Sequence, residues 1–213
     1  MQNASSRGAR RYTALAIALV LVAFGAAAVV QGLDGRSTVR DALALEHVKG
    51  QQGMTPAGIA AKAKAAGLTD VALPTCSVAG QAIDNGTDAR CFAQYMRIDA
   101  LIATGGKTYA QMPRFASKDG KGTNVEAEAV KLPSGVGMPN PARNVWITET
   151  ALSTALNTSY MAEQISLFGI AVGGAFLLVG LVFGAFALSG VRLPRLSPAG
   201  AYRARAEKVA QTA

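Results

Sequence analysis

The stretch ISLFGIAVGGAFLLVGLVFGAFALS, from Ile165 to Ser189, decides the fold, because it contains 25 residues without a charged side chain. A helix that rises about 1.5 Å per residue needs roughly 20 apolar residues to cross about 30 Å of hydrocarbon. A second uncharged stretch, TALAIALVLVAFGAAAVV from Thr13 to Val30, has 18 residues and reaches that length narrowly. The sequence therefore predicts two membrane spans, at residues 13–31 and 165–189.

The first span follows three arginines, so a cleaved signal peptide is the alternative to a retained anchor. Small residues suitable for cleavage occur at Ala26, Ala27 and Ala28. The apolar run nevertheless continues through Val30, which makes it longer than the core of a usual signal peptide. We therefore expect the first span to be retained.

The excess of basic residues lies at the two ends of the chain, whose formal net charge is +8. Residues 1–12 contain three arginines and no acid, and residues 190–213 contain five basic residues and one acid. Short basic flanks of membrane spans stay in the cytoplasm. The pattern predicts that both termini, including the basic tail at 190–213, are cytoplasmic and that residues 32–164 lie outside. The charge thus indicates topology and does not indicate nucleic-acid binding.

The chain has two cysteines, Cys76 and Cys91, and both lie in the segment that this topology places outside. Disulfides form and persist in such compartments. We expect a bridge between them, with two unpaired thiols as the alternative. With 14 residues between the cysteines, the closure stabilises the fold by about 3 kcal/mol in the chain-entropy model.

Capping and turn residues divide the outer domain, residues 32–140, into short helices. Ser37-Thr38 followed by Asp41 resembles a capping box and predicts a separate short helix after the first span. Thr55 before Pro56 predicts a second helix, from about Pro56 to Ala66. The following segment, up to Gly86, is interrupted by proline and glycine and is predicted to be irregular.

An amphipathic helix is predicted from about Thr87 to the glycine pair at 105–106. Its apolar positions recur at helical spacing and are Cys91, Tyr95, Ile98 and Ile102. Residues 117–140 are rich in Gly, Lys, Pro and Asp, so they predict a mobile surface loop with a short helix near Val125 to Val130.

Asn140-Pro141 supplies a helix cap and a first-turn proline, and no further glycine or proline occurs before Gly169. This predicts a single helix from Pro141 to Ser189, in which residues 141–164 form an outer stalk and residues 165–189 form the second span. The expected fold class is therefore all-α, with two transmembrane helices, a mainly helical extracytoplasmic domain, and a second span continuous with a long stalk helix.

One face of this long helix consists of small residues. The predicted helix-packing interface contains Ala155, Ala162, Ser166, Gly169, Gly173, Gly180, Gly184 and Ala187. Two G-x-x-x-G pairs in this set permit close approach of another helix. The first span offers a comparable small face, formed by Ala14, Ala18, Gly25 and Ala28. Three partners fit: the first span, a second copy of the chain, or a helix of a larger complex.

The residue types that common catalytic and metal sites require are scarce. The single histidine, His47, makes neither a histidine-rich zinc site nor an iron site with two histidines. The sequence GGKT at 105–108 resembles the end of a phosphate-binding loop, but Leu101 stands where that motif needs its first glycine. We expect a protein that is not an enzyme and has no catalytic residues, cofactor or metal site.

Two segments resemble a group of actinobacterial two-span membrane proteins: AIDNGTDARCFAQYMRIDALIATGGKTYAQM, from Ala82 to Met112, and RNVWITETALSTALNTSYMAEQ, from Arg143 to Gln164. The resemblance implies a helical outer domain and a bacterial plasma membrane. Some of these proteins are labelled aromatic ring-opening dioxygenases. A non-haem iron enzyme of that type needs two histidine ligands, and this chain has one, so the label is not carried over.

The leading functional hypothesis is a non-catalytic accessory or scaffold subunit. Its partners would be the lipid bilayer and either other membrane-protein subunits or a second copy, bound through the second span and the stalk. The alternative is an extracytoplasmic ligand-binding or sensing module anchored by two spans. A membrane-bound enzyme or redox protein is the third possibility.

Overall fold

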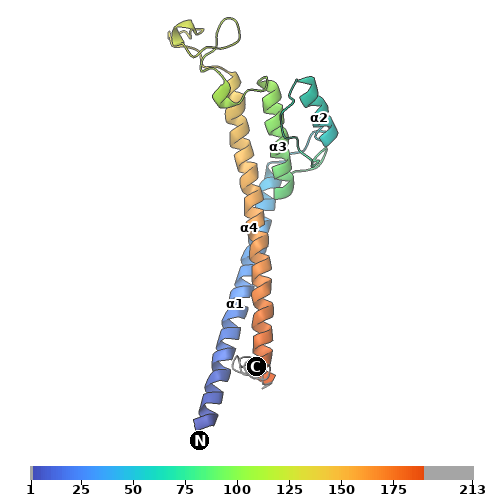
Figure 1. The fold of residues 1–213 in the computed structure, drawn as a ribbon, viewed down its shortest axis with the longest axis vertical. Helices are drawn as coiled ribbons and strands as arrows, with labels where there is room; N and C mark the ends of the chain where they lie inside the picture. The colour runs from blue at the N-terminus through green and yellow to red at the C-terminus, as the bar shows by residue number, and fades with distance from the viewer. Residues whose placement is uncertain (1, 190–213) are drawn as a thin grey trace, which may run out of the picture. The chain divides into compact units, whose positions relative to one another are not determined.

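The computed structural model describes residues 2–189, which form four α-helices and two short 3-10 helices (Figure 1). The helices are α1 (Gln2–Leu45), α2 (Pro56–Ala65), α3 (Gly86–Ala103), η1 (Tyr109–Gln111), η2 (Glu126–Glu128) and α4 (Ala142–Ser189). Residues 2–189 contain no β-strand, only four isolated bridges, so the all-α class is confirmed. The predicted basic tail, residues 190–213, lies outside the described residues.

The described chain divides into two compact units. Residues 2–26 and 174–189 form the helix-pair unit, and residues 27–173 form the domain unit. Both α1 and α4 are long and apolar enough to cross a membrane. Only 11% of the most apolar window of each helix is buried, which is unlike the core helix of a soluble protein.

The helix-pair unit is held by close contact between α1 and α4. A Cβ atom added at Gly180 would lie 3.0 Å from the carbonyl oxygen of Ala18, and one added at Gly184 would lie 3.7 Å from the Ala18 Cβ. The rings of Phe24 and Phe176 meet edge to face at 5.6 Å. Since residue numbers fall along α1 as they rise along α4, the two helices are antiparallel here.

The domain unit is built around α3, which packs against α2 (Figure 1). The Thr55 hydroxyl caps α2 by accepting from the Gly58 N–H at 3.0 Å, as the sequence predicts. On α3, the side chain of Asn85 accepts from the Asp88 N–H at 3.0 Å, so this helix begins at Gly86, slightly earlier than predicted. Caps of this kind satisfy N–H groups that have no partner within the helix.

The buried face of α3 holds the irregular segment before it. Cys76 and Cys91 form a disulfide with a Cα–Cα distance of 6.1 Å, at the predicted position. Tyr95 is fully buried, and its hydroxyl donates to the carbonyl oxygen of Cys76 at 2.7 Å. Burial raises the pKa of the Tyr95 phenol. The disulfide and the Tyr95 hydrogen bond, both made to Cys76, thus fix the irregular segment against α3.

The prediction of a separate short helix after the first span is wrong, because α1 continues to Leu45. The hydroxyls of Ser37 and Thr38 both donate to the carbonyl oxygen of Asp34, at 2.9 and 3.0 Å, within the same helix. The nearby Gly32 does not end a helix. A Cβ atom there would lie 2.6 Å from the carbonyl oxygen of Ser166, so this glycine permits close packing on α4.

Residues 113–140 form a hydrogen-bonded loop. Isolated bridges join Phe115 to Thr123 and to Pro139. The helix predicted near Val125 to Val130 is a single 3-10 turn, η2. Hydrogen bonds from the Ser117 hydroxyl and the Lys121 N–H hold the pKa of Asp119 below its usual value. The mobility of this loop stays a prediction.

Candidate functional site

The outer part of α4 carries almost no charge at its surface. Between Asn144 and Gln164 the charged residues are Glu149 and Glu163, and their exposed fractions are 5% and 3%. Charged side chains are almost never fully buried unless they are paired. The surroundings of these two carboxylates therefore decide what this part of the helix does.

Glu163, on α4, forms hydrogen bonds with both α1 and α3. One of its oxygens accepts a hydrogen bond from Arg36 Nε on α1 at 3.0 Å, and the other accepts from the Gly86 N–H of α3 at 2.7 Å. Arg40 Nε lies 4.0 Å from the same carboxylate. A negative charge at the first turn of α3 also interacts favourably with that helix's dipole. The buried charge is thus compensated by a cation and by a helix N-terminus.

Gly86 is the residue that lets α3 reach α4. A Cβ atom at this position would lie 2.7 Å from the Tyr160 Cα and 3.1 Å from the Ser159 carbonyl oxygen. One turn further along α3, the guanidinium of Arg90 lies 4.7 Å from the centre of the Tyr160 ring, within cation–π range. The absent side chain allows the backbone contact that the Glu163 hydrogen bond requires.

Glu149 has a different environment, at a groove of about 520 Å³ between α3 and α4. The groove is lined by Met96, Asp99, Ala100, Pro141, Asn144, Val145, Thr148 and Glu149. The Glu149 carboxylate accepts from the hydroxyl of its neighbour Thr150 at 3.4 Å. In the part of the chain that the structure describes, no basic nitrogen lies within 4.0 Å of it.

Trp146, three residues before Glu149 on α4, is buried. Its indole N–H donates to the carbonyl oxygen of Lys107 at 2.8 Å and lies 3.2 Å from the Thr104 hydroxyl. The guanidinium of Arg97 lies 5.3 Å from the centre of its ring. Arg97 is thus placed on the indole, and its nitrogens do not reach Glu149.

The structure packs most of the predicted small-residue face against α1. In the domain unit, Ser166 and Gly169 contact the stretch from Ala28 to Gly35, and Gly173 is buried. In the helix-pair unit, Gly180 and Gly184 contact the Ala18 turn. The Ala187 carbonyl oxygen accepts from Arg11 Nε at 3.2 Å. Ala162 is half-buried, whereas Ala155 is exposed.

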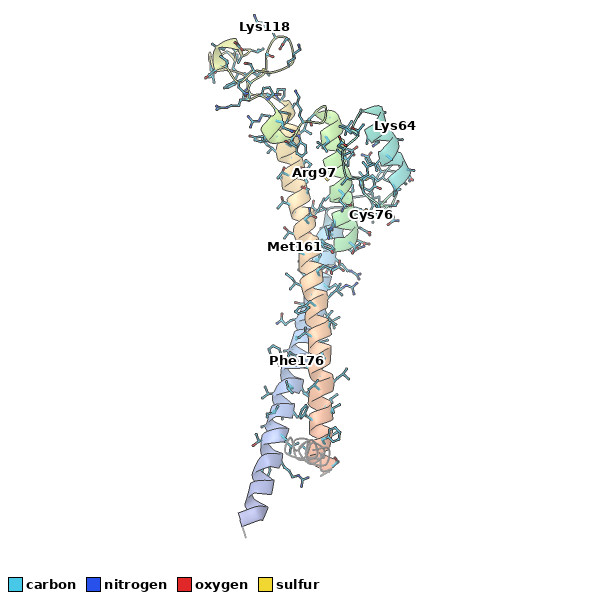
Figure 2. The ribbon with its side chains drawn as sticks, viewed as in Figure 1. Lys64, Cys76, Arg97, Lys118, Met161 and Phe176 are labelled. Carbon is cyan, nitrogen blue, oxygen red and sulfur yellow. A yellow bond between two sulfur atoms is a disulfide. The ribbon has the colours of Figure 1, made fainter. Side chains whose placement is uncertain are left out.

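A second face of α4 is open to solvent. Its exposed positions are separated alternately by four and three residues, as in a coiled-coil seam. These positions are Ile147, Ala151, Thr154, Thr158 and Met161. We call them the outer seam. Ile147 is 56% exposed and Met161 is 61% exposed; Figure 2 shows Met161 at the surface of α4.

Other chemistry is sparse in the described residues. His47 lies in the turn after α1 with a φ of 50°, where its N–H donates to the Ala44 carbonyl oxygen at 3.2 Å. Within residues 2–189, no three His, Cys, Asp or Glu side chains gather as a metal site would require. The chain matches no family model, no curated protein and no solved structure.

Proposed function

We propose that the chain is a non-catalytic accessory or scaffold subunit of a bacterial plasma membrane, and that it binds another membrane protein along α4. The observation that carries this proposal is the uncharged outer seam. Between Asn144 and Gln164 both charged side chains are buried, while Ile147 and Met161 of the seam are 56% and 61% exposed. A helix surface in water normally carries charge, so this surface is suited to being covered.

The proposed topology places residues 13–31 and 165–189 in the bilayer, residues 32–164 outside, and both termini in the cytoplasm. The low burial of both apolar helices supports the spans, since lipid takes the place of a protein core. The disulfide supports an oxidising compartment for the domain. In this topology α4 is the stalk and the second span in one helix, and a partner bound outside is held beside the membrane.

The packing of α1 narrows the choice of contact surface. Ser166, Gly169, Gly180 and Gly184 already contact α1 within their own units, so their small-residue face is occupied inside the chain. A partner helix would therefore meet the outer seam. Where Ala151, Thr154 and Thr158 lie along it, short side chains allow a close approach.

The proposal is tested by adding one charge to the outer seam of the full-length protein. We expect Ala151→Glu to abolish co-purification of membrane partners after gentle detergent extraction, because burying an unpaired carboxylate in an interface is costly. The matched control is Ala61→Glu, at an exposed alanine of α2, which should leave co-purification unchanged.

Quantitative mass spectrometry of the two preparations and of the unaltered protein provides the readout. Recovery of the unaltered chain as a monomer without partners would contradict the proposal. A second copy of the chain as the partner, lost in the Ala151→Glu variant, would identify the seam as a homo-oligomer interface.

The alternative function, an extracytoplasmic ligand-binding or sensing module, is favoured by one specific observation. The groove beside Glu149 has a volume of about 520 Å³, within the range of small-molecule sites. The groove shares no residue with the outer seam, because its lining residues are other positions of the N-terminal turns of α4, together with Pro141 and residues of α3.

A further inference from the structure

Glu149 is a buried carboxylate without a cationic partner, and it lines an open groove. Its exposed fraction is 5%, and its one hydrogen bond comes from the Thr150 hydroxyl at 3.4 Å. Buried charges in proteins are ordinarily paired with an opposite charge or coordinate a metal ion. The described residues supply no such charge within 4.0 Å.

We propose that this groove binds an alkylammonium group, with Glu149 as the counter-ion of its nitrogen. This inference goes beyond the scaffold function and does not depend on it. An ammonium group brings three N–H donors and no acceptor, which matches a site whose charged members are both carboxylates. Those are Glu149 on α4 and Asp99 on α3.

The rest of the lining suits the hydrocarbon stem of such a ligand. Met96, Ala100, Val145 and Pro141 supply apolar surface. The side-chain oxygens of Asn144 and Thr148 supply neutral acceptors at the same groove. A mostly apolar concavity with a few polar groups is the usual composition of a small-molecule site.

Asp99 is already engaged in part, because Lys62 Nζ lies 3.5 Å from its carboxylate. That pair is substantially exposed to solvent and contributes little to stability. Asp99 is therefore placed to add negative potential at the mouth of the groove, while the deeper Glu149 provides the specific contact.

The same ammonium chemistry occurs in free amines and in lysine side chains, and two probes separate these sources. The full-length protein in lipid nanodiscs is titrated calorimetrically with 1,5-diaminopentane and, separately, with lysine blocked at both backbone ends. The neutral control ligand is 1,5-pentanediol. We expect at least one of the two cationic probes to bind and the diol not to bind. Tighter binding of the diamine indicates a free amine, and tighter binding of the blocked lysine indicates a side chain.

Three variants make the test specific to the groove. Glu149→Gln should weaken binding at least about tenfold, since it replaces the charge-assisted hydrogen bond to the ammonium group with a weaker neutral one. Glu46→Gln removes the same charge at an exposed position of the turn after α1 and should leave binding unchanged. Thr148→Tyr, at the exposed rim, should weaken binding by filling the groove while Glu149 is kept.

Binding of neither cation, or binding that Glu149→Gln leaves unaltered, would overturn the proposal. The outcome is independent of the Ala151→Glu co-purification test. A groove that binds no amine leaves the scaffold function intact, and a chain without partners leaves the amine site intact.

Discussion

Glu149 and Glu163 lie about four turns apart on α4, both almost completely buried, and their surroundings differ. Glu163 meets a guanidinium and a backbone N–H from two other helices, at 3.0 and 2.7 Å. Glu149 meets the hydroxyl of its own neighbour at 3.4 Å and faces a groove. The first carboxylate is compensated within the chain, whereas the second is placed where an outside group can reach it.

This difference separates two uses of a buried charge. A carboxylate paired inside the fold costs several kcal/mol when it is removed, because its former partners lose their compensation. A buried carboxylate without a cationic partner already destabilises the folded state, so its removal should leave the free energy of unfolding unchanged or raise it. A buried charge without a partner breaks the rule that buried charges are paired, and such exceptions are expected at functional sites. The sign of the stability change therefore distinguishes a structural contact from a binding site.

The largest expected effect is that of Glu163→Ala. The substitution leaves the Gly86 N–H and Arg36 without their acceptor. We expect the free energy of unfolding to fall by about 3 kcal/mol, the lower end of the range for breaking a buried ion pair, because Arg36 is partly exposed. Urea unfolding of the full chain in nanodiscs can be followed by the fluorescence of Trp146, the single tryptophan. A loss below about 1 kcal/mol would mean that this junction is not a principal tie between the helices.

Next in size is Gly86→Ala, which tests the close approach of α3 to α4. The new Cβ would lie 2.7 Å from the Tyr160 Cα and 2.9 Å from a Glu163 oxygen, so a helix must shift, and overpacking of this kind costs about 1–3 kcal/mol. Gly53→Ala is the matched control, because nothing lies within 4 Å of its added Cβ. Equal stability of the two variants would show that the contact at Gly86 is loose.

A smaller effect is expected for Arg36→Gln, which removes the cation and leaves the carboxylate. Arg36 is partly exposed, and Arg40 lies 4.0 Å from the same carboxylate, so we expect a loss of about 1 kcal/mol. A double-mutant cycle of Arg36→Gln with Glu163→Gln isolates their coupling. Arg40→Gln should cost less than Arg36→Gln, and the reverse order would assign the pairing to Arg40.

The sequence predicted the elements whose signals are local. Thr55 precedes Pro56, and the stripe of Cys91, Tyr95 and Ile98 repeats at helical spacing, so α2, α3 and the disulfide could be placed. Such signals lie within a few residues of the structure they determine. The capping-box prediction at Ser37 failed because the same hydroxyl can bond back into a continuing helix.

The candidate site depended on contacts that sequence proximity does not reveal. Glu163 and Gly86 are separated by 77 residues in the chain. Only the folded structure shows that the Glu163 carboxylate accepts a hydrogen bond from the first residue of α3. The one available signal was the pair of acids in an otherwise uncharged segment of α4. It predicts that a partner covers this segment, but it does not distinguish the paired carboxylate from the unpaired one.

The smallest change, and the one of opposite sign, is expected for Glu149→Gln without ligand. The amide keeps the shape of the side chain and removes a buried charge that lacks a cation, so the free energy of unfolding should stay the same or rise by up to about 1 kcal/mol. Glu46→Gln, at an exposed position, should change it by less than about 0.5 kcal/mol. A clear loss at Glu149 would reveal a structural partner in solution and would place this carboxylate in the same class as Glu163. A stabilising result, together with weaker amine binding, would show that the Glu149 carboxylate serves its ligand at the expense of the chain's own stability.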